Sequence, residues 1–264
     1  MELTGSHVLV TGASRGVGAG LARAFASAGA RVSLVARSAE AIAALAEEID
    51  GVAVAADLLD PEQVAGLIER VEGAAGAPVD VLVNNAGIDL TQGLVDFDHG
   101  QLSRIAQLNL VVPMELSRQV ITGMVARRRG HIVNISSMAG AAVLPGLVPY
   151  AATKAALTHF TAGLRAELRG LPVGTTVIEV GLVPTDLGES VLGYGPTAAS
   201  FRRLYRLQLL PDTPLDRLCA ATVSAVRRDR RHVRLPRRAA MHSMLAEAPR
   251  RMTEWILTGV RPRP

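Results

Sequence analysis

Short apolar runs alternate with helical patterns along most of the chain, and this alternation limits the fold more than any other feature. The strands that we expect lie at 7–10, 31–36, 52–55, 79–83, 131–136, 175–180 and 232–235. The helices that we expect lie at 17–28, 39–49, 61–72, 101–127, 151–169 and 214–227. Such alternation is typical of a parallel sheet with helices on both faces. We therefore expect an α/β fold with a doubly wound parallel sheet, and 264 residues suit one such domain.

Composition argues against several classes of protein. Hydrophobic residues make up 49% of the chain, which is too much for intrinsic disorder. Cys219 is the one cysteine, and its apolar helical context predicts a buried thiol in a reducing compartment. The longest uncharged run, 132–153, contains prolines and polar residues, which argues against a membrane-spanning helix. No signal peptide is visible, so we expect a cytoplasmic protein.

Charged and metal-binding residues give further limits. The six histidines are scattered with no pair at metal-ligand spacing, so we expect no metal site. Basic residues are not interleaved with aromatic ones, which argues against nucleic-acid binding. The net charge of +4 hides an asymmetry, because arginine far outnumbers the acids from Ser190 onward. This basic region indicates either an anionic partner or a solvated surface.

A glycine-rich segment follows the first expected strand and begins the first helix. Glycines at such a turn let backbone amides approach a pyrophosphate, which sits at the positive end of the helix. This placement predicts a Rossmann-like dinucleotide site rather than a merely structural turn. The residues that we assign to it are Gly12, Ser14, Arg15, Gly16, Val17 and Gly18.

The end of the second expected strand indicates which dinucleotide is bound. An acid there would hold the ribose diol of NAD, but Arg37 stands in this region instead. Arg37 and Arg15 together can clamp a 2′-phosphate through charge-assisted hydrogen bonds, which favours NADP(H). The alternative is that these arginines face solvent. Asp57, with Leu58 beside it, ends the third strand and can contact the adenine.

Asn85, Ala86 and Gly87 follow the fourth expected strand. Ligands of open α/β sheets bind at the carboxyl ends of the strands, where small residues let the chain pass close to them. We therefore assign these residues to the cofactor site, with a plain turn as the alternative.

Four polar residues form the candidate reactive group. Tyr150 and Lys154 are four residues apart at a helix start, so they share a face. A free phenol has a pKa of about 10, and a neighbouring ammonium is expected to lower it. Lys154 is the single lysine of the chain, which suggests a specific task. Ser137 can hydrogen-bond the reacting oxygen, and Asn109 can hold a water that links Lys154 to solvent.

These motifs together resemble those of the short-chain dehydrogenase/reductase family. The resemblance covers about residues 5–190 and includes thirteen residues from Ser137 to Tyr150. It implies that Tyr150 is the general acid/base, Ser137 the stabiliser of the substrate oxygen, Lys154 the ribose ligand and Asn109 the anchor of a proton relay. It also implies that Thr185, with Val183, contacts the nicotinamide.

Two departures from the family pattern affect these expectations. Members usually carry Pro-Gly after the sixth strand, whereas this chain has Val180 and Gly181, so we expect a freer loop there. The chain also lacks the Asp-Gly-Gly that ends many members. A tetramer contact built from that terminus is therefore less expected, while a dimer through the helices of Asn109 and Tyr150 stays open. A homo-oligomer is the expected state.

The expected activity is hydride transfer between NADP(H) and a ketone or secondary alcohol. The candidate substrate walls are mainly apolar, which favours a lipid, steroid or polyketide-like substrate. They are formed by residues 138–144, Leu147, Leu182, Val183, Leu187, Leu192 and Tyr194. One alternative is a catalytically silent NADPH-binding sensor or scaffold, in which one or more of the four residues of the reactive group should be replaced. Another is a nucleotide-sugar epimerase or dehydratase with the same Tyr and Lys, although such relatives usually have a longer substrate domain.

The expected organisation has two parts. Residues 1–235 form the dinucleotide-binding and catalytic domain, in which 182–212 is a substrate loop or lid with a long loop or broken helix over 182–200. Residues 236–264 form a basic, amphipathic helical extension, broken at Pro249. We expect this extension to pack on the same domain. Packing on a partner subunit and contact with an anionic membrane are the alternatives.

Overall fold

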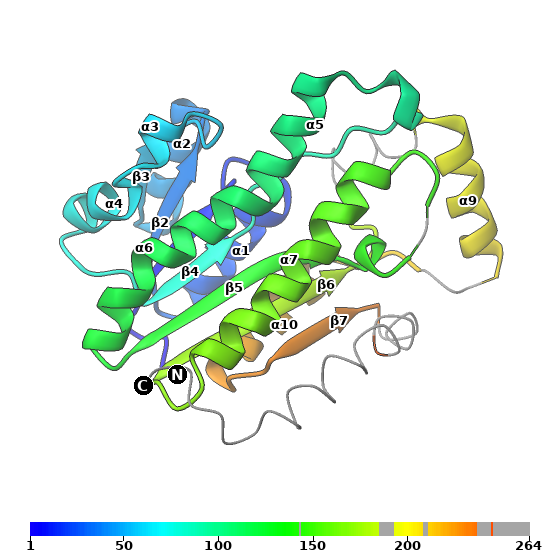
Figure 1. Cartoon of the computed structure of the whole chain (residues 1–264). Helices are drawn as coiled ribbons and strands as arrows, with labels where there is room; N and C mark the ends of the chain where they lie inside the picture. Colours follow the sequence, from blue (N-terminus) through cyan, green and yellow to red (C-terminus); the bar gives the residue numbers. More distant parts are fainter. Residues whose placement is uncertain (143, 185–192, 208–210, 237–243, 245–264) are drawn as a thin grey trace.

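The computed structural model describes residues 1–142, 144–184, 193–207, 211–236 and 244. Within them, seven parallel strands form one sheet in the order β3-β2-β1-β4-β5-β6-β7 (Figure 1). The strands are β1 (His7–Thr11), β2 (Arg31–Ala36), β3 (Val52–Ala55), β4 (Val81–Asn84), β5 (Gly130–Ser137), β6 (Val173–Val180) and β7 (His232–Leu235). The predicted doubly wound parallel sheet is therefore confirmed.

Helices cover both faces of this sheet, and two apolar clusters result. Val8 and Val10 of β1 belong to the cluster with α1, α2 and α10, whereas Leu9 belongs to the cluster with α4, α6 and α7. Because successive side chains of a strand point to opposite faces, a strand buried on both faces reads as a continuous apolar run. The helices are α1 (Gly16–Ser27), α2 (Ala39–Ile49), α3 (Pro61–Val64), α4 (Leu67–Ala75), α5 (His99–Ala106), α6 (Val112–Ala126), α7 (Val148–Glu167), α9 (Gly195–Arg206) and α10 (Leu215–Arg227).

The strand order reverses between β1 and β4. The chain passes from β1 outward to β2 and β3, and then returns to β4 on the other side of β1 before continuing to β7. Ligands of open α/β sheets bind in the crevice at such a switch point, outside the carboxyl ends of the strands. The loops that follow β1 and β4 are therefore placed where a ligand is expected.

The single helix predicted at 61–72 is wrong, because the structure has two helices there. Ala65 is extended, with a ψ of 124°, and Gly66 has a φ of 67°. Glycine adopts this left-handed conformation at no steric cost, so the chain can turn between α3 and α4. The apolar pattern continues across the break, which is why periodicity alone missed it.

The long helix predicted at 101–127 is also interrupted. A π-helical turn, η2 (Gln107–Val111), separates α5 from α6. Pro113, at the start of α6, has no N–H to donate to the carbonyl four residues earlier, and its ring would clash with that carbonyl. The carbonyl is that of Asn109, so a wider turn relieves the conflict. Such π-bulges often mark functional sites.

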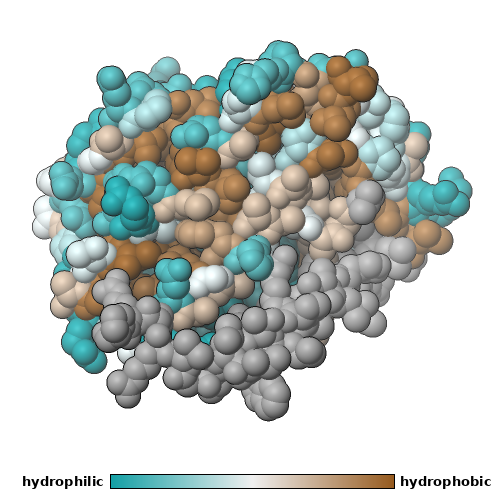
Figure 2. Space-filling model, viewed as in Figure 1, coloured by the Kyte–Doolittle hydropathy of each residue, from teal (hydrophilic) through white to brown (hydrophobic). Residues whose placement is uncertain are grey.

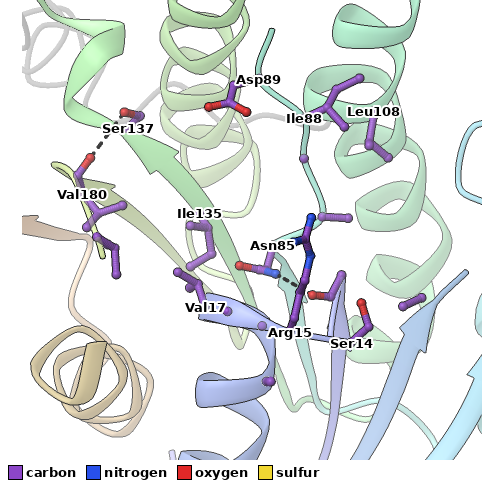
Figure 3. Close-up of a pocket in the computed structure, with 18 of the residues that line it drawn as sticks. Ser14, Arg15, Val17, Asn85, Ile88, Asp89, Leu108, Ile135, Ser137 and Val180 are labelled. Atoms are coloured by element: carbon purple, nitrogen blue, oxygen red, sulfur yellow. Dashed lines mark hydrogen bonds between the residues drawn. The ribbon is translucent and has the colours of Figure 1, made fainter. Parts of the chain in front are cut away.

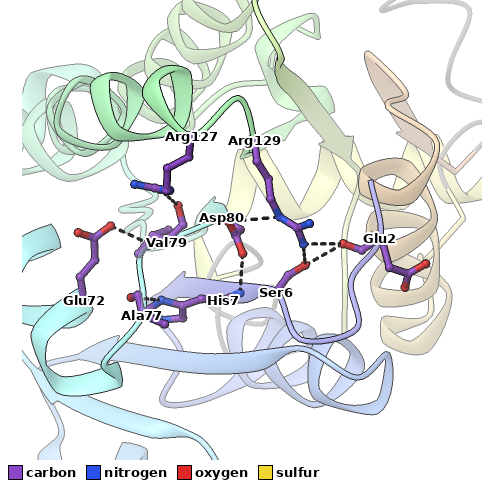
Figure 4. Close-up of polar contacts among 9 residues, drawn as sticks. All are labelled: Glu2, Ser6, His7, Glu72, Ala77, Val79, Asp80, Arg127 and Arg129. Carbon is purple, nitrogen blue, oxygen red and sulfur yellow. Dashed lines mark hydrogen bonds and ion pairs between the residues drawn. The ribbon is translucent and has the colours of Figure 1, made fainter.

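The end of the sheet opposite to the crevice is closed by polar contacts (Figure 4). The Asp80 carboxylate accepts a hydrogen bond from the backbone N–H of His7 at 3.1 Å and pairs with Arg129 Nε at 3.4 Å. Arg129 also donates to the Ser6 hydroxyl and to the Glu2 carbonyl. These contacts join the starts of β1, β4 and β5, so we assign them a structural role.

We expect His131, at the start of β5, to make the fold sensitive to acid. Its ring is 2% exposed and contacts Thr176 Oγ1 at 2.7 Å, and burial lowers its pKa from 6.5 to about 4. As the pH falls from 6.5 towards 4, the unfolded chain takes up a proton that the folded chain does not. The free energy of unfolding should therefore fall by about 3 kcal/mol over this range. Urea unfolding at several pH values measures this loss.

His131→Gln should flatten this part of the stability curve, since it removes the titrating group. The exposed His159 on α7 provides the control, and His159→Gln should leave the curve as it is. A His131→Gln protein with an unchanged pH dependence would contradict the assignment.

The remaining predicted segments are partly described. The predicted loop at 182–200 is irregular through Pro184 and gives way to α9 at Gly195. Except for Pro236 and Met244, the predicted extension at 236–264 lies outside the described residues, as do residues 185–192. No helix among the described residues is long and apolar enough to cross a membrane.

Apolar side chains gather on the face of the molecule that α6 and α7 cover (Figure 2). Val111 of η2, Met114 of α6 and Val148 of α7 are 44%, 42% and 50% exposed. Surfaces of this kind are often buried between subunits. A homo-oligomer stays a prediction.

Candidate active site

A cavity of about 1670 Å³ opens at the carboxyl ends of the strands (Figure 3). Pockets that hold one small ligand have volumes of roughly 300–1,000 Å³. This cavity therefore has room for a dinucleotide and a substrate together. Sixteen of the predicted site residues line it: Gly12, Ser14, Arg15, Gly16, Val17, Gly18, Arg37, Asp57, Leu58, Asn85, Ala86, Gly87, Ser137, Tyr150, Lys154 and Val183.

The glycine-rich loop is packed too closely for side chains. A Cβ atom on Gly18 would lie 2.1 Å from the carbonyl oxygen of Gly12, and one on Gly12 would lie 2.8 Å from Ala86 Cα. Gly12 also has a φ of 66°. A bare backbone at the first turn of α1 leaves its amides facing the cavity, as a pyrophosphate requires. The residues present therefore fit a dinucleotide.

Asn85 holds this loop against the end of β4. Its side-chain amide donates to the carbonyl oxygens of Thr11 at 2.9 Å and Gly12 at 3.2 Å. The Thr11 hydroxyl in turn accepts hydrogen bonds from the backbone N–H groups of Asn85 and Ala86. The sequence predicted a close approach of this segment to the cofactor, and the structure adds that Asn85 fixes the position of the glycine loop.

The nucleotide end of the cavity is basic. Arg15 and Arg37 both line it, and no acid stands at the carboxyl end of β2, where the chain continues through Arg37 to Ser38, the N-cap of α2. Asp57 also lines the cavity, with one carboxylate oxygen accepting a hydrogen bond from the backbone N–H of Leu59 at 3.0 Å. Two arginines therefore line the cavity, one from the glycine-rich loop and one from the end of β2.

Ser137, Tyr150 and Lys154 meet at the other end of the cavity. Ser137 ends β5, while Tyr150 and Lys154 lie on the first two turns of α7. The Lys154 Nζ atom lies 5.7 Å from the centre of the Tyr150 ring and donates to the Ile135 carbonyl at 2.9 Å. Tyr150 and Lys154 therefore share a face of α7, as predicted, and the Ile135 carbonyl of β5 binds the lysine.

Burial sets the protonation of this pair. Burial raises the pKa of Tyr150 to about 12, and the adjacent Ser137 hydroxyl partly opposes this shift. Burial lowers the pKa of Lys154 to about 8. The sequence led us to expect that Lys154 lowers the tyrosine pKa, but in the structure the lowering contact is the Ser137 hydroxyl, and desolvation outweighs it. At neutral pH Tyr150 therefore carries its proton.

Asn109 does not line the cavity, and its side chain binds the backbone of Ile88. Its Oδ1 atom accepts from the Ile88 N–H at 2.9 Å, and its Nδ2 atom donates to the Ile88 carbonyl at 2.8 Å. Asn109 thus clamps Ile88 by both backbone groups. A Cβ on Gly87 would lie 3.0 Å from Asn109 Oδ1 and 3.6 Å from Lys154 Nζ. A side chain at position 87 would therefore fill the space between these two groups. The relay role of Asn109 stays a prediction.

The first residues after β6 make hydrogen bonds to other segments of the fold. The Gly181 N–H donates to the Leu235 carbonyl at 2.7 Å, and the Thr213 N–H donates to the Leu182 carbonyl at 2.9 Å. The Ser137 hydroxyl donates to the Val180 carbonyl at 3.3 Å. The expectation of a freer loop stays a prediction, and Thr185 lies outside the described residues.

Several cavity residues were missed by the sequence analysis. Among them are Ile88, Asp89, Arg104, Leu108, Ile135, Phe201 and Leu204. Asp89 could have been found, since it is an acid two residues after Gly87, which ends the motif that follows β4. The apolar residues carry no such signal, because an apolar side chain that lines a cavity cannot be distinguished in the sequence from one that packs in the core.

Comparison with known proteins places the chain in a family. Residues 6–192 match the family model for short chain dehydrogenases. An uncharacterized short-chain type dehydrogenase/reductase from Sinorhizobium fredii is 40% identical over 186 residues, which are 70% of this chain and 73% of that protein. A ketoacyl reductase from Nostoc is 36% identical over 186 residues, and the match spans 64% of its length.

Solved structures agree with this match. A gluconate 5-dehydrogenase from Burkholderia cenocepacia, in complex with NADP and tartrate, superimposes with a TM-score of 0.80 at 27% identity, covering 90% of this chain and 96% of that one. Other similar structures hold NADPH or NADH. The fold and the cavity together define an oxidoreductase that binds a nicotinamide dinucleotide. The chain belongs to the short-chain dehydrogenase/reductase family, whose members act on alcohol and ketone groups.

Proposed function

We propose that the protein is an NADP(H)-dependent oxidoreductase that interconverts a ketone and a secondary alcohol on a hydrophobic substrate. The observation that carries this proposal is the meeting of Ser137, Tyr150 and Lys154 at one end of a cavity whose other end is basic. When bound, the nicotinamide supplies the hydride to the carbonyl carbon or takes it from the alcohol carbon.

The chain's own residues supply the proton and the orientation. In the reductive direction the Ser137 hydroxyl turns from the Val180 carbonyl and donates its hydrogen bond to the carbonyl oxygen of the substrate, and the Tyr150 phenol gives that oxygen its proton. A tyrosine that is protonated at neutral pH suits this role as an acid. Lys154 would hold the nicotinamide ribose through Nζ, and the Ile135 carbonyl orients it at 2.9 Å.

A hydrophobic substrate is supported by the walls around Tyr150. Leu144, Leu147 and Phe201 are buried in a small apolar cluster with Ala139, and Tyr150 packs against it. Leu182 and Leu204 pack on the same cluster. Such walls favour the apolar part of a substrate by burying it.

The preference for NADP(H) is supported by Arg15 and Arg37. We expect the protein to bind NADPH more tightly than NADH, and Arg37→Asp to weaken NADPH binding by roughly 10–150-fold, since a charge-assisted hydrogen bond contributes about 1.5–3 kcal/mol. NADH affinity should not fall, because an acid in this region can hold the ribose diol of NAD. Titration of both dinucleotides, followed by nicotinamide fluorescence, measures these constants.

Arg217→Asp provides the matched control. Arg217 is an exposed residue of α10 outside the cavity lining, so the same change of charge there should leave both affinities unaltered. Equal binding of NADPH and NADH would remove the role assigned to Arg15 and Arg37. Binding of neither dinucleotide would overturn the proposed oxidoreductase.

A further inference from the structure

Asp89 lies near Ser137 and Tyr150 in the cavity, on a segment that is hydrogen-bonded to Asn109. It follows Ile88, whose N–H and carbonyl are both bonded to the Asn109 side chain. Asn109 is itself fixed in the π-helical turn and is fully buried. Asp89 lines the cavity with a half-buried side chain, which Figure 3 draws between Ser137 and Ile88.

The negative charge of Asp89 affects the protonation of Tyr150 and Lys154. The Asp89 carboxylate raises the pKa of Tyr150, which adds to the larger effect of burial. It also raises the pKa of Lys154, which opposes the larger effect of burial. Both residues lie on α7, whereas Asp89 comes from the segment after β4. A substrate that contacts Tyr150 is therefore exposed to the same negative charge.

The other acids of the described cavity lining have different places. Asp57 lies at the nucleotide end, and Glu48 is paired with Arg23 at 2.7 Å. Near Tyr150 the remaining walls are formed largely by apolar residues such as Leu147 and Phe201. An acid among apolar walls is costly unless it is paired or hydrogen-bonded, because charge is poorly solvated there.

From this placement we infer that Asp89 is a specificity-determining residue, which accepts a hydrogen bond from a hydroxyl or ammonium group next to the reacting carbon and repels an acid at that position. This inference rests on the proposed function and narrows its substrate class to apolar ketones with a donor group beside the carbonyl. A carboxylate has about four acceptor positions. A substrate donor can therefore bind alongside any contact that Asp89 makes within the protein.

Three ketones of equal chain length test the inference: octan-2-one, 1-hydroxyoctan-2-one and 2-oxooctanoate. They differ only in the group next to the carbonyl. With NADPH, the wild-type protein should reduce the hydroxyketone with a kcat/KM at least equal to that of octan-2-one, and 2-oxooctanoate at least about tenfold less well, since juxtaposed like charges are unfavourable. Asp89→Asn should raise kcat/KM for 2-oxooctanoate by at least about tenfold relative to octan-2-one.

Two further measurements separate this role from a structural one. Asp96→Asn removes an exposed acid of the same segment outside the cavity lining, so it should leave the three kcat/KM ratios unaltered. Because Lys154 is the single lysine, its titration can be followed by NMR in protein labelled with carbon-13 lysine. The Lys154 pKa should fall in Asp89→Asn and stay constant in Asp96→Asn.

Unchanged ratios in Asp89→Asn, or a Lys154 titration that does not move, would overturn the role of Asp89 while leaving the proposed function in place. A wild-type protein that prefers 2-oxooctanoate would overturn it as well. If the wild-type protein reduces none of the three ketones with NADPH, the proposed function fails, and the inference about Asp89 fails with it.

Discussion

Tyr150→Phe should reduce kcat for ketone reduction by roughly 10²–10⁴-fold, the usual contribution of a positioned proton donor. The variant keeps the aromatic ring, which packs against the cluster of Leu144, Leu147 and Phe201, so the fold should be retained. It loses the hydroxyl that gives the substrate oxygen its proton. Turnover with NADPH at neutral pH measures the loss, and NADPH titration should show an affinity within about twofold of wild type.

Tyr205→Phe is the matched control for this change. Tyr205 lies on α9, donates its hydroxyl to Asp212 and is not part of the cavity lining. The same loss of a phenol hydroxyl should leave kcat within about threefold of wild type, because no reacting atom loses a partner. Activity of Tyr150→Phe within about tenfold of wild type would contradict the role of Tyr150 as the proton donor.

The layered fold was predictable from sequence because its strands are buried on both faces. The strand of Val8, Leu9 and Val10 reads as a continuous apolar run, as expected for a parallel sheet that helices cover on both sides. The breaks within elements were harder to see. Gly66 and Pro113 interrupt helices whose apolar pattern continues across the break, and the effect of each depends on local backbone geometry.

The reactive group was predictable for a related reason. Four residues from Tyr150 to Lys154 fix a shared helical face, and the end of β5 fixes the place of Ser137. Both constraints are local. The protonation of the group was not predictable, since the pKa of Tyr150 depends on burial and on Asp89, a residue 61 positions away in the chain. Tertiary packing decides such effects.

Gly18→Ala is expected to damage both stability and cofactor binding. The added Cβ would lie 2.1 Å from the Gly12 carbonyl oxygen and 2.6 Å from Asn85 Nδ2, so the glycine loop has to move. That movement weakens the hydrogen bonds from Asn85 to Thr11 and Gly12. We expect the free energy of unfolding to fall by about 1–3 kcal/mol, the usual effect of overpacking. NADPH affinity should fall at least about tenfold, because the displaced amides no longer face the pyrophosphate.

Gly163→Ala distinguishes this packing effect from a general effect of glycine replacement. Gly163 lies within α7, and a Cβ there would meet no atom within 4 Å. Alanine is favoured over glycine inside a helix by up to about 1 kcal/mol, so this variant should be as stable as wild type or more stable. Urea unfolding and NADPH titration of both variants give the comparison. If Gly18→Ala unfolds at the wild-type urea concentration and binds NADPH normally, then the close approach of α1 to the glycine loop does not explain why glycine stands at position 18.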